Sequence, residues 1–559
     1  MFARLKLWSR RLLAHQAGFP PPHSSVVIRK DVAIPMDDGV TLYATQYVPA
    51  TAGDYPTVLI RSPWGRGWKN APFSLLYGYV AQRFAERGYI VILQDVRSAH
   101  DSPAANLVPH ENEQRDGQAT IRWLVQQPWF SGRLGLWGAS YLGYVQWAVL
   151  AAELPTIEVL ALVPTTTATN WFPIFHPDGA LALDTLLRLQ FTSALVHFPR
   201  WRMLHALLTQ EARLAHAFAR LPLTEASPTL PPVPGFDFAA VMERTDLDDP
   251  LWQRIDLHDQ IATNDAHIHL IAGWHDIFLR EQLADYQTLR AAGKQPYLTI
   301  GPWHHTSQDL GAYSIRTALA WFDTHLKGDK EKLPTHPVTL FVQGANRWQN
   351  LQEWPPATIS LSYFIEQQGQ LVASQPSHDS SFDRYTYDPA QPTPTIGGPV
   401  LAPRAGQQNN GPIEARSDVL TYTSERLTNP LTIMGTPEVH LYVTSSAAST
   451  DFFVRLCDVT ADNRSLNVTD GFIRLTWSAK EMGQCHKVTI RLWPTAYEFA
   501  PGNRLRIQIA SGAHPRWNRN LGVASPTFTE TSIYSAEQQI HHDHHSPSKL
   551  LLPVFRERT

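Results

Sequence analysis

Cysteine is almost absent from this chain, which has 559 residues and only Cys457 and Cys485. Two cysteines cannot build a disulfide framework, and they exclude a cysteine-rich zinc or iron–sulfur site. An excess of one charge is also missing, because 47 Lys and Arg residues oppose 50 Asp and Glu residues for a net charge of -3. A nearly balanced chain lacks the strongly basic surface of a polyanion-binding protein, so nucleic-acid binding is not expected.

Long apolar runs are the third absence. Stretches such as Val145–Ala152 end well short of the ~20 apolar residues that a membrane-spanning helix needs, so no membrane span is expected. The first residues, MFARLKLWSRRLLAHQAGF, are basic, and their charges interrupt the apolar core that a secretory signal peptide requires. We expect a basic tail on a cytoplasmic protein. A transit peptide and an interfacial amphipathic helix are the alternatives, since no acidic residue precedes Asp31.

Residues 26–165 alternate between strand-like and helix-like patterns. The runs TVLIR (57–61) and YIVILQ (89–94) are continuous apolar segments, which suit strands buried on both faces of a parallel sheet. Between them, LLYGYVAQRFAERG has helical periodicity and stops at Gly88. This alternation predicts an α/β core whose sheet is mostly parallel.

Two changes of pattern divide the rest of the chain. Residues 166–254 lose the strand signal and carry Leu and Ala at helical spacing, which predicts an inserted helical cap. The strand-and-helix pattern returns over residues 255–332, which we assign to a second segment of the core. From 333 to 559, short β runs such as VTLFVQG are separated by Pro- and Gly-rich turns, which predicts an all-β sandwich or jelly roll.

A serine between a predicted strand and a predicted helix is the strongest chemical signal. In GRLGLWGASYLGYVQW, a buried strand runs into residues 138–143, and a helix follows. A serine on such a tight turn projects its hydroxyl, and flanking glycines let the backbone pass without a Cβ clash. The helix N-terminus behind Ser140 offers N–H groups and a positive dipole end to a developing oxyanion.

A nucleophilic serine needs a base, and the base needs an acid that fixes its tautomer. In α/β-hydrolases these residues follow in the order serine, acid, histidine, on loops after successive strands. Here Asp276 follows the predicted strand HIHLIA, and His304 and His305 follow the predicted strand YLTI. A helix N-cap is the structural alternative for Asp276, and a solvated loop position is the alternative for either histidine.

These motifs together resemble the cocaine-esterase-like branch of the Xaa-Pro dipeptidyl-peptidase superfamily, peptidase family S15. The G-x-S-Y-x-G elbow is matched by residues 138–143, the G-W-x-D segment by 273–276, and the G-P-W-x-H segment by 301–305. Further matches, including QDVR, TDGFIR and HPRWNRN, extend the resemblance over nearly the whole chain. The resemblance implies an α/β-hydrolase core, an inserted helical cap and a C-terminal jelly roll.

The resemblance also implies roles for the catalytic residues. Ser140 would attack an acyl carbonyl, and Asp276 would orient the base. The family pattern puts the catalytic imidazole at the second position of the histidine doublet, which is His305. The backbone N–H of Tyr141 would be one oxyanion donor.

One departure concerns the second oxyanion donor. In the family this donor is commonly a tyrosine hydroxyl from an R-x-P-Y segment, whereas residues 61–64 of this chain read RSPW. An indole N–H can only donate and sits on a larger ring. Trp64 is therefore a candidate oxyanion residue, with packing of the pocket as the alternative.

The sequence favours an ester substrate, with an amide as the weaker choice. Amino-acid ester hydrolases of this superfamily carry carboxylates just after the triad aspartate to hold an ammonium group, but here Ile277 and Phe278 follow Asp276. Phe278 matches an aromatic residue that lines the acyl pocket in esterase members, and core packing is its alternative. Trp171 and Phe172, at the start of the cap, are pocket candidates by position alone.

Two other functions stay open on the sequence alone. A dipeptidyl-peptidase would need a carboxylate-lined amine site, and a non-catalytic carbohydrate-binding module would keep the fold without the chemistry. No Gly-rich phosphate loop and no recognised metal-ligand spacing occur, so neither a cofactor nor a metal is expected, the histidines of 541–545 included. The expected partner is a small-molecule ester or amide. The oligomeric state is open, with a homodimer as one option.

Overall fold

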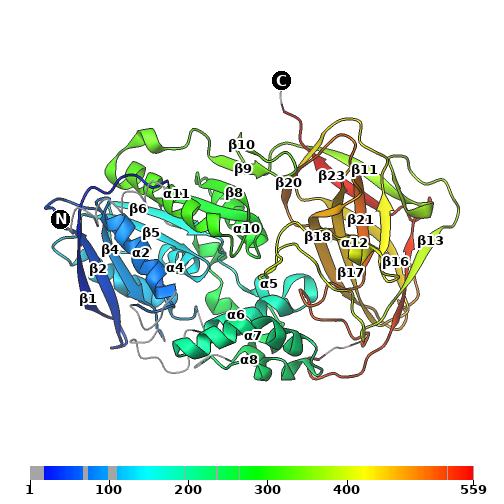
Figure 1. Cartoon of the computed structure of the whole chain (residues 1–559), viewed down its shortest axis with the longest axis horizontal. Coiled ribbons are helices and arrows are strands. Elements are labelled where there is room, and N and C mark those ends of the chain that lie inside the picture. The colour runs from blue at the N-terminus through cyan, green and yellow to red at the C-terminus, as the bar shows by residue number, and fades with distance from the viewer. Residues whose placement is uncertain are drawn as a thin grey trace.

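The computed structural model describes residues 18–66, 73–97, 110–195, 197–233, 237–263, 265–524 and 527–557. The basic tail, and residues 98–100 of the loop that follows QDVR, lie outside these ranges. Figure 1 shows an α/β part at one end of the molecule, an all-β part at the other, and helices along the lower edge between them. Among the helices of the described residues, none has both the length and the apolar character needed to cross a membrane.

Ten strands of the described chain form the core sheet, in the order β1-β2-β4-β3-β5-β6-β7-β8-β9-β10. Strands β3 to β9 are parallel to one another, whereas β2 is antiparallel to β1 and β4, and β10 is antiparallel to β9. Their bounds are β1 Val26–Pro35, β2 Thr41–Pro49, β3 Thr57–Ser62, β4 Ile90–Asp95, β5 Arg133–Ala139, β6 Val159–Thr165, β7 His267–His275, β8 Tyr297–His304, β9 Val338–Val342 and β10 Arg347–Leu351.

Helices cover both faces of this sheet, which is why its central strands are apolar throughout. Val58 and Ile60 of β3 pack in one apolar cluster with Phe84 and Phe322, while Leu59 faces a second cluster on the other side. Helices α2 and α11 contribute to the first cluster, and α3, α4 and α10 to the second. The bounds are α2 Phe73–Ala85, α3 Glu113–Val125, α4 Tyr141–Leu150, α10 Leu279–Ala291 and α11 Gln308–Lys327.

The helical cap is inserted between β6 and β7. Its helices are α5 Phe172–Phe175, α6 Leu183–Leu195, α7 Arg200–Phe218, α8 Phe238–Glu243 and α9 Pro250–Ile255. Leu186 and Phe191 of α6 belong to the same apolar cluster as Trp147 of α4, so the cap shares a core with one face of the sheet. Burial of these large side chains fixes the cap on the side of the sheet that also carries α4.

Thirteen strands of the described chain build the C-terminal all-β domain, on the right in Figure 1. Strand β16 has the alternating burial of a strand with one face in the core: Val439, Leu441 and Val443 point into the apolar core, and the residues between them are partly exposed. The strands are β11 Ile359–Glu366, β12 Gln370–Val372, β13 Phe382–Tyr387, β14 Leu420–Thr423, β15 Leu431–Gly435, β16 Glu438–Ser445, β17 Ser449–Val459, β18 Ser465–Thr476, β19 His486–Arg491, β20 Thr495–Phe499, β21 Arg504–Ala510, β22 Ala536–His541 and β23 Lys549–Val554. The predicted α/β core with a helical cap and a C-terminal all-β domain is confirmed.

The core sheet continues past residue 333, where the sequence pattern placed the start of the sandwich. Strand β9 pairs in parallel with β8, with Val338 opposite Leu298, and β10 returns antiparallel to β9. The run VTLFVQG therefore extends the core sheet. Immediately after β9, the N–H of Gln343 donates to the carbonyl of Ala496 at 3.0 Å, which links the sheet to β20 of the all-β domain.

Three charged side chains are buried together in the all-β domain. Asp470 lies 2.9 Å from Arg455 and 2.5 Å from Arg516, and all three side chains are almost fully buried. Burial alone would raise the pKa of the Asp470 carboxyl, but the two guanidiniums outweigh it and hold the pKa below its ordinary value. Each of these buried charges is therefore stabilised by the opposite charge of its neighbours, and removing Asp470 would leave both guanidiniums buried without a counter-charge.

Replacing Asp470 with alanine should destabilise the protein by about 3–5 kcal/mol, because two guanidiniums would stay buried without a counter-charge. Urea unfolding followed by tryptophan fluorescence measures this loss. The matched control is Asp462→Ala, which removes an exposed pair with Arg464 and should leave the unfolding midpoint in place. A wild-type midpoint for Asp470→Ala would contradict the role of this cluster.

Candidate active site

Ser140 occupies the turn that joins β5 to α4. Its backbone has φ 58° and ψ −123°, a strained conformation for a residue with a side chain. The turn is held by hydrogen bonds: the N–H of Ser140 donates to the carbonyl of Thr165 at 3.0 Å, and the N–H groups of Gly143 and Tyr144 donate to the carbonyl of Ser140. This geometry matches the nucleophile elbow that the sequence predicts.

The two flanking glycines are required by close approaches. A Cβ on Gly138 would lie 2.3 Å from the Cβ of Leu142 and 2.9 Å from its carbonyl oxygen. A Cβ on Gly143 would lie 2.4 Å from a methyl carbon of Thr167, in the loop after β6. The spacing of the glycines in the motif therefore follows from how tightly α4 folds back on the sheet.

Asp276 and His305 meet at the same edge of the sheet. His305 Nδ1 lies 3.0 Å from Asp276 Oδ2, and the N–H of Phe278 donates to Asp276 Oδ1 at 2.9 Å. Asp276 is buried, whereas the His305 ring is partly exposed. Because β5, β7 and β8 are parallel, their carboxyl ends bring the loops of Ser140, Asp276 and His305 to one edge.

The neighbouring His304 has different surroundings. It ends β8, its N–H donates to the hydroxyl of Ser307 at 2.9 Å, and its Nδ1 lies 3.2 Å from Thr306 Oγ1. Burial lowers the pKa of the His304 imidazole. Of the two histidines, it is thus His305 whose ring is hydrogen-bonded to Asp276.

Aromatic rings form a wall beside His305. The ring of Phe278 lies 5.4 Å from that of His305, and the ring of Trp171 lies 5.0 Å from that of Phe278. His110 continues the wall, with its ring 4.2 Å from Trp171 and 4.5 Å from Tyr141. Of the three predicted pocket residues, Phe278 thus contacts His305 and Trp171 contacts Phe278, and both side chains are buried.

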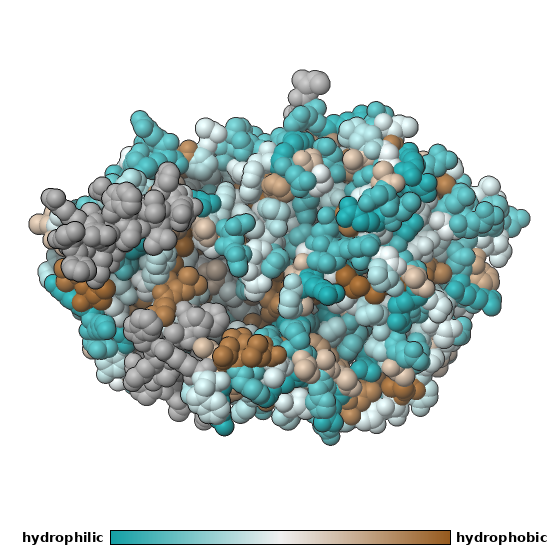
Figure 2. All heavy atoms as spheres, in the orientation of Figure 1, coloured by the Kyte–Doolittle hydropathy of each residue, from teal (hydrophilic) through white to brown (hydrophobic). Residues whose placement is uncertain are grey.

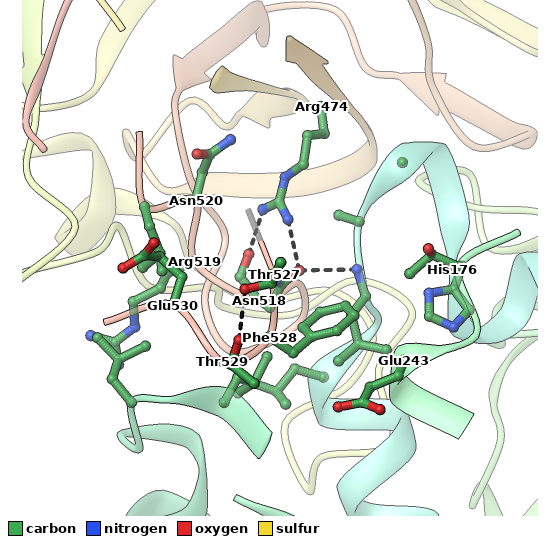
Figure 3. Close-up of a pocket in the computed structure, with 18 of the residues that line it drawn as sticks. His176, Glu243, Arg474, Asn518, Arg519, Asn520, Thr527, Phe528, Thr529 and Glu530 are labelled. Atoms are coloured by element: carbon green, nitrogen blue, oxygen red, sulfur yellow. Dashed lines mark hydrogen bonds between the residues drawn. The ribbon is translucent and has the colours of Figure 1, made fainter. Parts of the chain in front are cut away.

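Phe172, the third predicted pocket residue, borders a cavity of about 640 Å³ between the cap and the all-β domain, together with His176 and Phe218. Figure 3 shows residues that line this cavity, among them Arg474, whose guanidinium donates to Asn518 Oδ1 at 3.0 Å. Trp171 and Phe172 are adjacent in the chain but contact different rings, since Trp171 packs against Phe278 and Phe172 stacks on His176.

Trp64 follows β3 and has an internal partner. Its indole N–H donates to the hydroxyl of Tyr77 in α2, and its backbone N–H donates to Ser62 Oγ at 3.2 Å. Burial raises the pKa of Tyr77 to about 12, and the Trp64 hydrogen bond opposes this rise. An oxyanion bound by Trp64 would therefore share or replace the contact with Tyr77.

A buried polar network lies beside the elbow, and no sequence motif indicated it. The Tyr141 hydroxyl donates to Glu113 Oε1 at 2.7 Å, and Arg61 Nη1 lies 2.8 Å from Glu113 Oε2. Arg61 also donates to Gln94 at 3.0 Å. Burial raises the pKa of the Glu113 carboxyl against the opposing effect of Arg61. The side chain that follows Ser140 is thus held by groups from β3 and α3.

The histidines of the C-terminal stretch serve the all-β domain. His541 in β22 lies 2.8 Å from the hydroxyl of Thr444, and His542 lies 3.2 Å from Asp383. Within the described ranges, no group of three or more His, Cys, Asp or Glu side chains is arranged to hold a metal ion.

Two family models match the chain. The X-Pro dipeptidyl-peptidase (S15 family) matches residues 38–307, and the X-Pro dipeptidyl-peptidase C-terminal non-catalytic domain matches residues 332–551. Cocaine esterase from Rhodococcus sp. (strain MB1 Bresler) is 29% identical, over 95% of this chain and 99% of that protein. The chain belongs to the X-Pro dipeptidyl-peptidase (S15) superfamily. The resemblance to its cocaine-esterase-like branch is confirmed.

Two solved structures share the architecture of nearly the whole chain. An aminopeptidase from the marine sediment archaeon Thaumarchaeota archaeon has a TM-score of 0.80 at 20% identity, covering 96% of this chain and 98% of its own. An α-amino acid ester hydrolase has a TM-score of 0.70 at 23% identity, covering 95% and 97%. At these identities they show the shared fold. As an S15 member with esterase relatives, the chain is a serine hydrolase of the ester-hydrolysing kind.

Proposed function

We propose that this S15 hydrolase cleaves carboxylic esters through an acyl-enzyme, with Ser140 as nucleophile, His305 as general base and Asp276 as the acid that orients it. The observation that carries the proposal is the 3.0 Å contact between His305 Nδ1 and Asp276 Oδ2. A carboxylate at Nδ1 fixes the tautomer in which Nε2 accepts a proton. The Ser140 elbow lies on the same edge of the sheet as His305, whose Nε2 would accept the proton of the Ser140 hydroxyl.

The reaction would proceed in two halves. Ser140 Oγ attacks the ester carbonyl carbon while His305 Nε2 takes the hydroxyl proton. The negative charge that develops on the carbonyl oxygen is stabilised by the N–H of Tyr141, the first residue of α4, where the helix dipole is positive. The tetrahedral intermediate collapses, the alcohol leaves with the proton from His305, and water then releases the acid by the same steps in reverse.

The acyl side is proposed to be apolar and without an α-ammonium group. Ile277 and Phe278 are both buried directly after Asp276, and neither can neutralise a substrate cation. The ring of Phe278 instead packs against His305, and Trp171 packs behind it, so the side of His305 that they cover is apolar. These contacts favour an ester with an apolar or aromatic acyl group over a dipeptide with a free amino terminus.

A substrate panel tests this function. Initial rates on p-nitrophenyl esters of graded acyl length are compared with rates on aminoacyl-p-nitroanilides. We expect turnover of the esters, and the acyl length with the highest rate indicates the size of the acyl pocket. Rates on the anilides should be near background. Faster cleavage of the anilides would favour a peptidase. A folded protein inactive on the entire panel would favour a non-catalytic module.

Trp64→Phe tests the second oxyanion donor. If the indole N–H binds the oxyanion, the variant should lose about 10²–10³-fold in kcat with KM little changed. The control is Tyr77→Phe, which removes the present acceptor of the indole N–H and should not lower kcat. A wild-type kcat for Trp64→Phe at unchanged stability would assign this side chain to packing.

Tyr141→Phe tests whether the buried network positions the oxyanion donor. Without its hydroxyl, the side chain loses Glu113, and the adjacent N–H is held less precisely. We expect about a tenfold loss in kcat at nearly constant KM, since small misplacements of catalytic groups are costly. Tyr144→Phe is the matched control, because its hydroxyl donates to the carbonyl of Ile255 instead. Equal kcat values for both variants would contradict the positioning role.

A further inference from the structure

The first half of cap helix α7 exposes large apolar side chains. Trp201 is 71% exposed, Leu204 61%, Leu207 47% and Leu208 79%, and we call these four residues the α7 apolar face. Trp201, Leu204 and Leu208 have the spacing of one helical stripe. Figure 2 shows a brown patch where Figure 1 draws α7. A contiguous exposed patch of this kind marks an interaction surface.

This face is not needed to hold the helix on the protein. The second half of α7 is anchored by Leu214, Ala217 and Phe218, which are buried in the shared core of cap and sheet. Glu211 adds a bidentate contact with Arg188 of α6, at 2.7 and 2.9 Å. The first half contributes Ala206 and the partly buried Met203 to that core and presents its large apolar residues Trp201, Leu204, Leu207 and Leu208 outward.

Most of the charged residues around the α7 apolar face are basic. The segment RWRMLHALLTQ, residues 200–210, contains no acidic residue. Arg202 is exposed, and its guanidinium lies 5.4 Å from the centre of the Trp201 ring. His205 and Arg213 are exposed on the same helix. The nearest carboxylate of the helix, Glu211, is already paired with Arg188.

We propose that the α7 apolar face binds an anionic lipid surface. A helix with Leu and Trp on one side and basic residues beside them lies in the membrane interface, where its apolar side chains enter the acyl boundary and its cations meet the headgroups. A second copy of the chain fits less well. Self-pairing of this helix would oppose Arg202, His205 and Arg213 with the same cations, and Glu211 is already engaged.

Binding through α7 would place the cap against the lipid surface. Apolar ester substrates dissolved in that surface would then lie next to the cap. Helix α7 packs on α6, and both share the apolar cluster that contains Trp171, at the edge of the aromatic wall. This consequence rests on the proposed ester hydrolysis. The binding itself does not, because it depends only on the composition and exposure of the helix.

Vesicle co-sedimentation of the full-length protein tests the proposal. We expect binding to phosphatidylcholine vesicles that contain about one quarter phosphatidylglycerol, and weaker binding to phosphatidylcholine alone. The double variant Leu204→Gln/Leu208→Gln should lower the partition coefficient about tenfold or more, since it removes two inserted side chains. Arg202→Gln should lower it severalfold and flatten its dependence on salt. The control is Ile359→Gln, which changes an apolar residue on β11 that is 50% exposed, and it should bind like wild type.

Four outcomes would overturn the proposal. The first is unchanged vesicle binding by the double variant, and the second is no binding by wild type. The third is loss of binding on deletion of residues 1–17 while the double variant still binds, which would assign the contact to the basic tail. The fourth is a dimer in sedimentation equilibrium that the double variant dissociates without any effect on vesicles. Rates on soluble p-nitrophenyl acetate should be equal in all α7 variants. If the proposed esterase activity is wrong, wild type will not turn over the ester, and this result is independent of the vesicle-binding measurement.

Discussion

Replacing Ser140 with alanine should lower kcat for p-nitrophenyl esters by about 10⁶-fold, the size of effect that follows loss of a serine nucleophile. Without Oγ no acyl-enzyme can form, so only the oxyanion donors and the binding site still assist attack by water. Initial rates at saturating ester measure the loss. Because residue 140 has a strained backbone with φ 58°, the unfolding midpoints of the two proteins are compared first, and equal midpoints show that the variant keeps the fold.

A second serine variant controls for indirect effects. Ser314 is buried and hydrogen-bonds Trp137 and Thr165, residues of β5 and β6 beneath the elbow. Ser314→Ala should alter stability and leave kcat within a small factor of wild type. Retention of substantial activity by Ser140→Ala, or a comparable loss in Ser314→Ala, would contradict the assignment of the nucleophile.

His305→Ala should cost about 10⁴–10⁶-fold in kcat, whereas His304→Ala should cost far less, because only the first removes the general base. The distinction follows from the hydrogen bonds: His305 Nδ1 faces Asp276, and His304 Nδ1 faces Thr306. Steady-state rates for the two single variants decide between adjacent residues that share the same loop.

Asp276→Asn completes this test. The amide would preserve the shape of the acid but favour the wrong imidazole tautomer, and we expect about 10⁴-fold lower kcat with KM little changed. If His304→Ala were the inactive variant while His305→Ala kept its activity, the geometry around Asp276 would have been misread. Equal, modest losses in both histidine variants would also contradict a single general base.

The sheet and the elbow were predictable because they depend on local patterns. Continuous apolar runs indicated strands covered on both faces, and the order of strands then placed the loops after β5, β7 and β8 at one edge. The glycines at 138 and 143 signalled a close approach of α4 to the sheet, and the distances to Leu142 and Thr167 give its physical cause. Family membership and fold class were confirmed. The catalytic roles stay predictions.

Other features depend on contacts that no local pattern encodes. Glu113 reaches Tyr141 across 28 residues, and no motif in the sequence links the two. Strand β9 has the alternating burial of a sandwich strand, and its sequence cannot specify which of two sheets it joins. The apolar spacing of α7 predicted a helix, but not that half of its apolar residues face outward. In each case the contact is determined by the tertiary structure and not by the local sequence.

The most direct measurement of the central claim is the site of covalent labelling. The full-length protein is treated with a fluorophosphonate, digested and mapped by mass spectrometry. We expect one modified peptide, from the segment that contains residues 138–143, with the phosphonyl group on Ser140 Oγ and no modification in Ser140→Ala. An active enzyme that is labelled at another serine, or that turns over esters without being labelled at all, would contradict it.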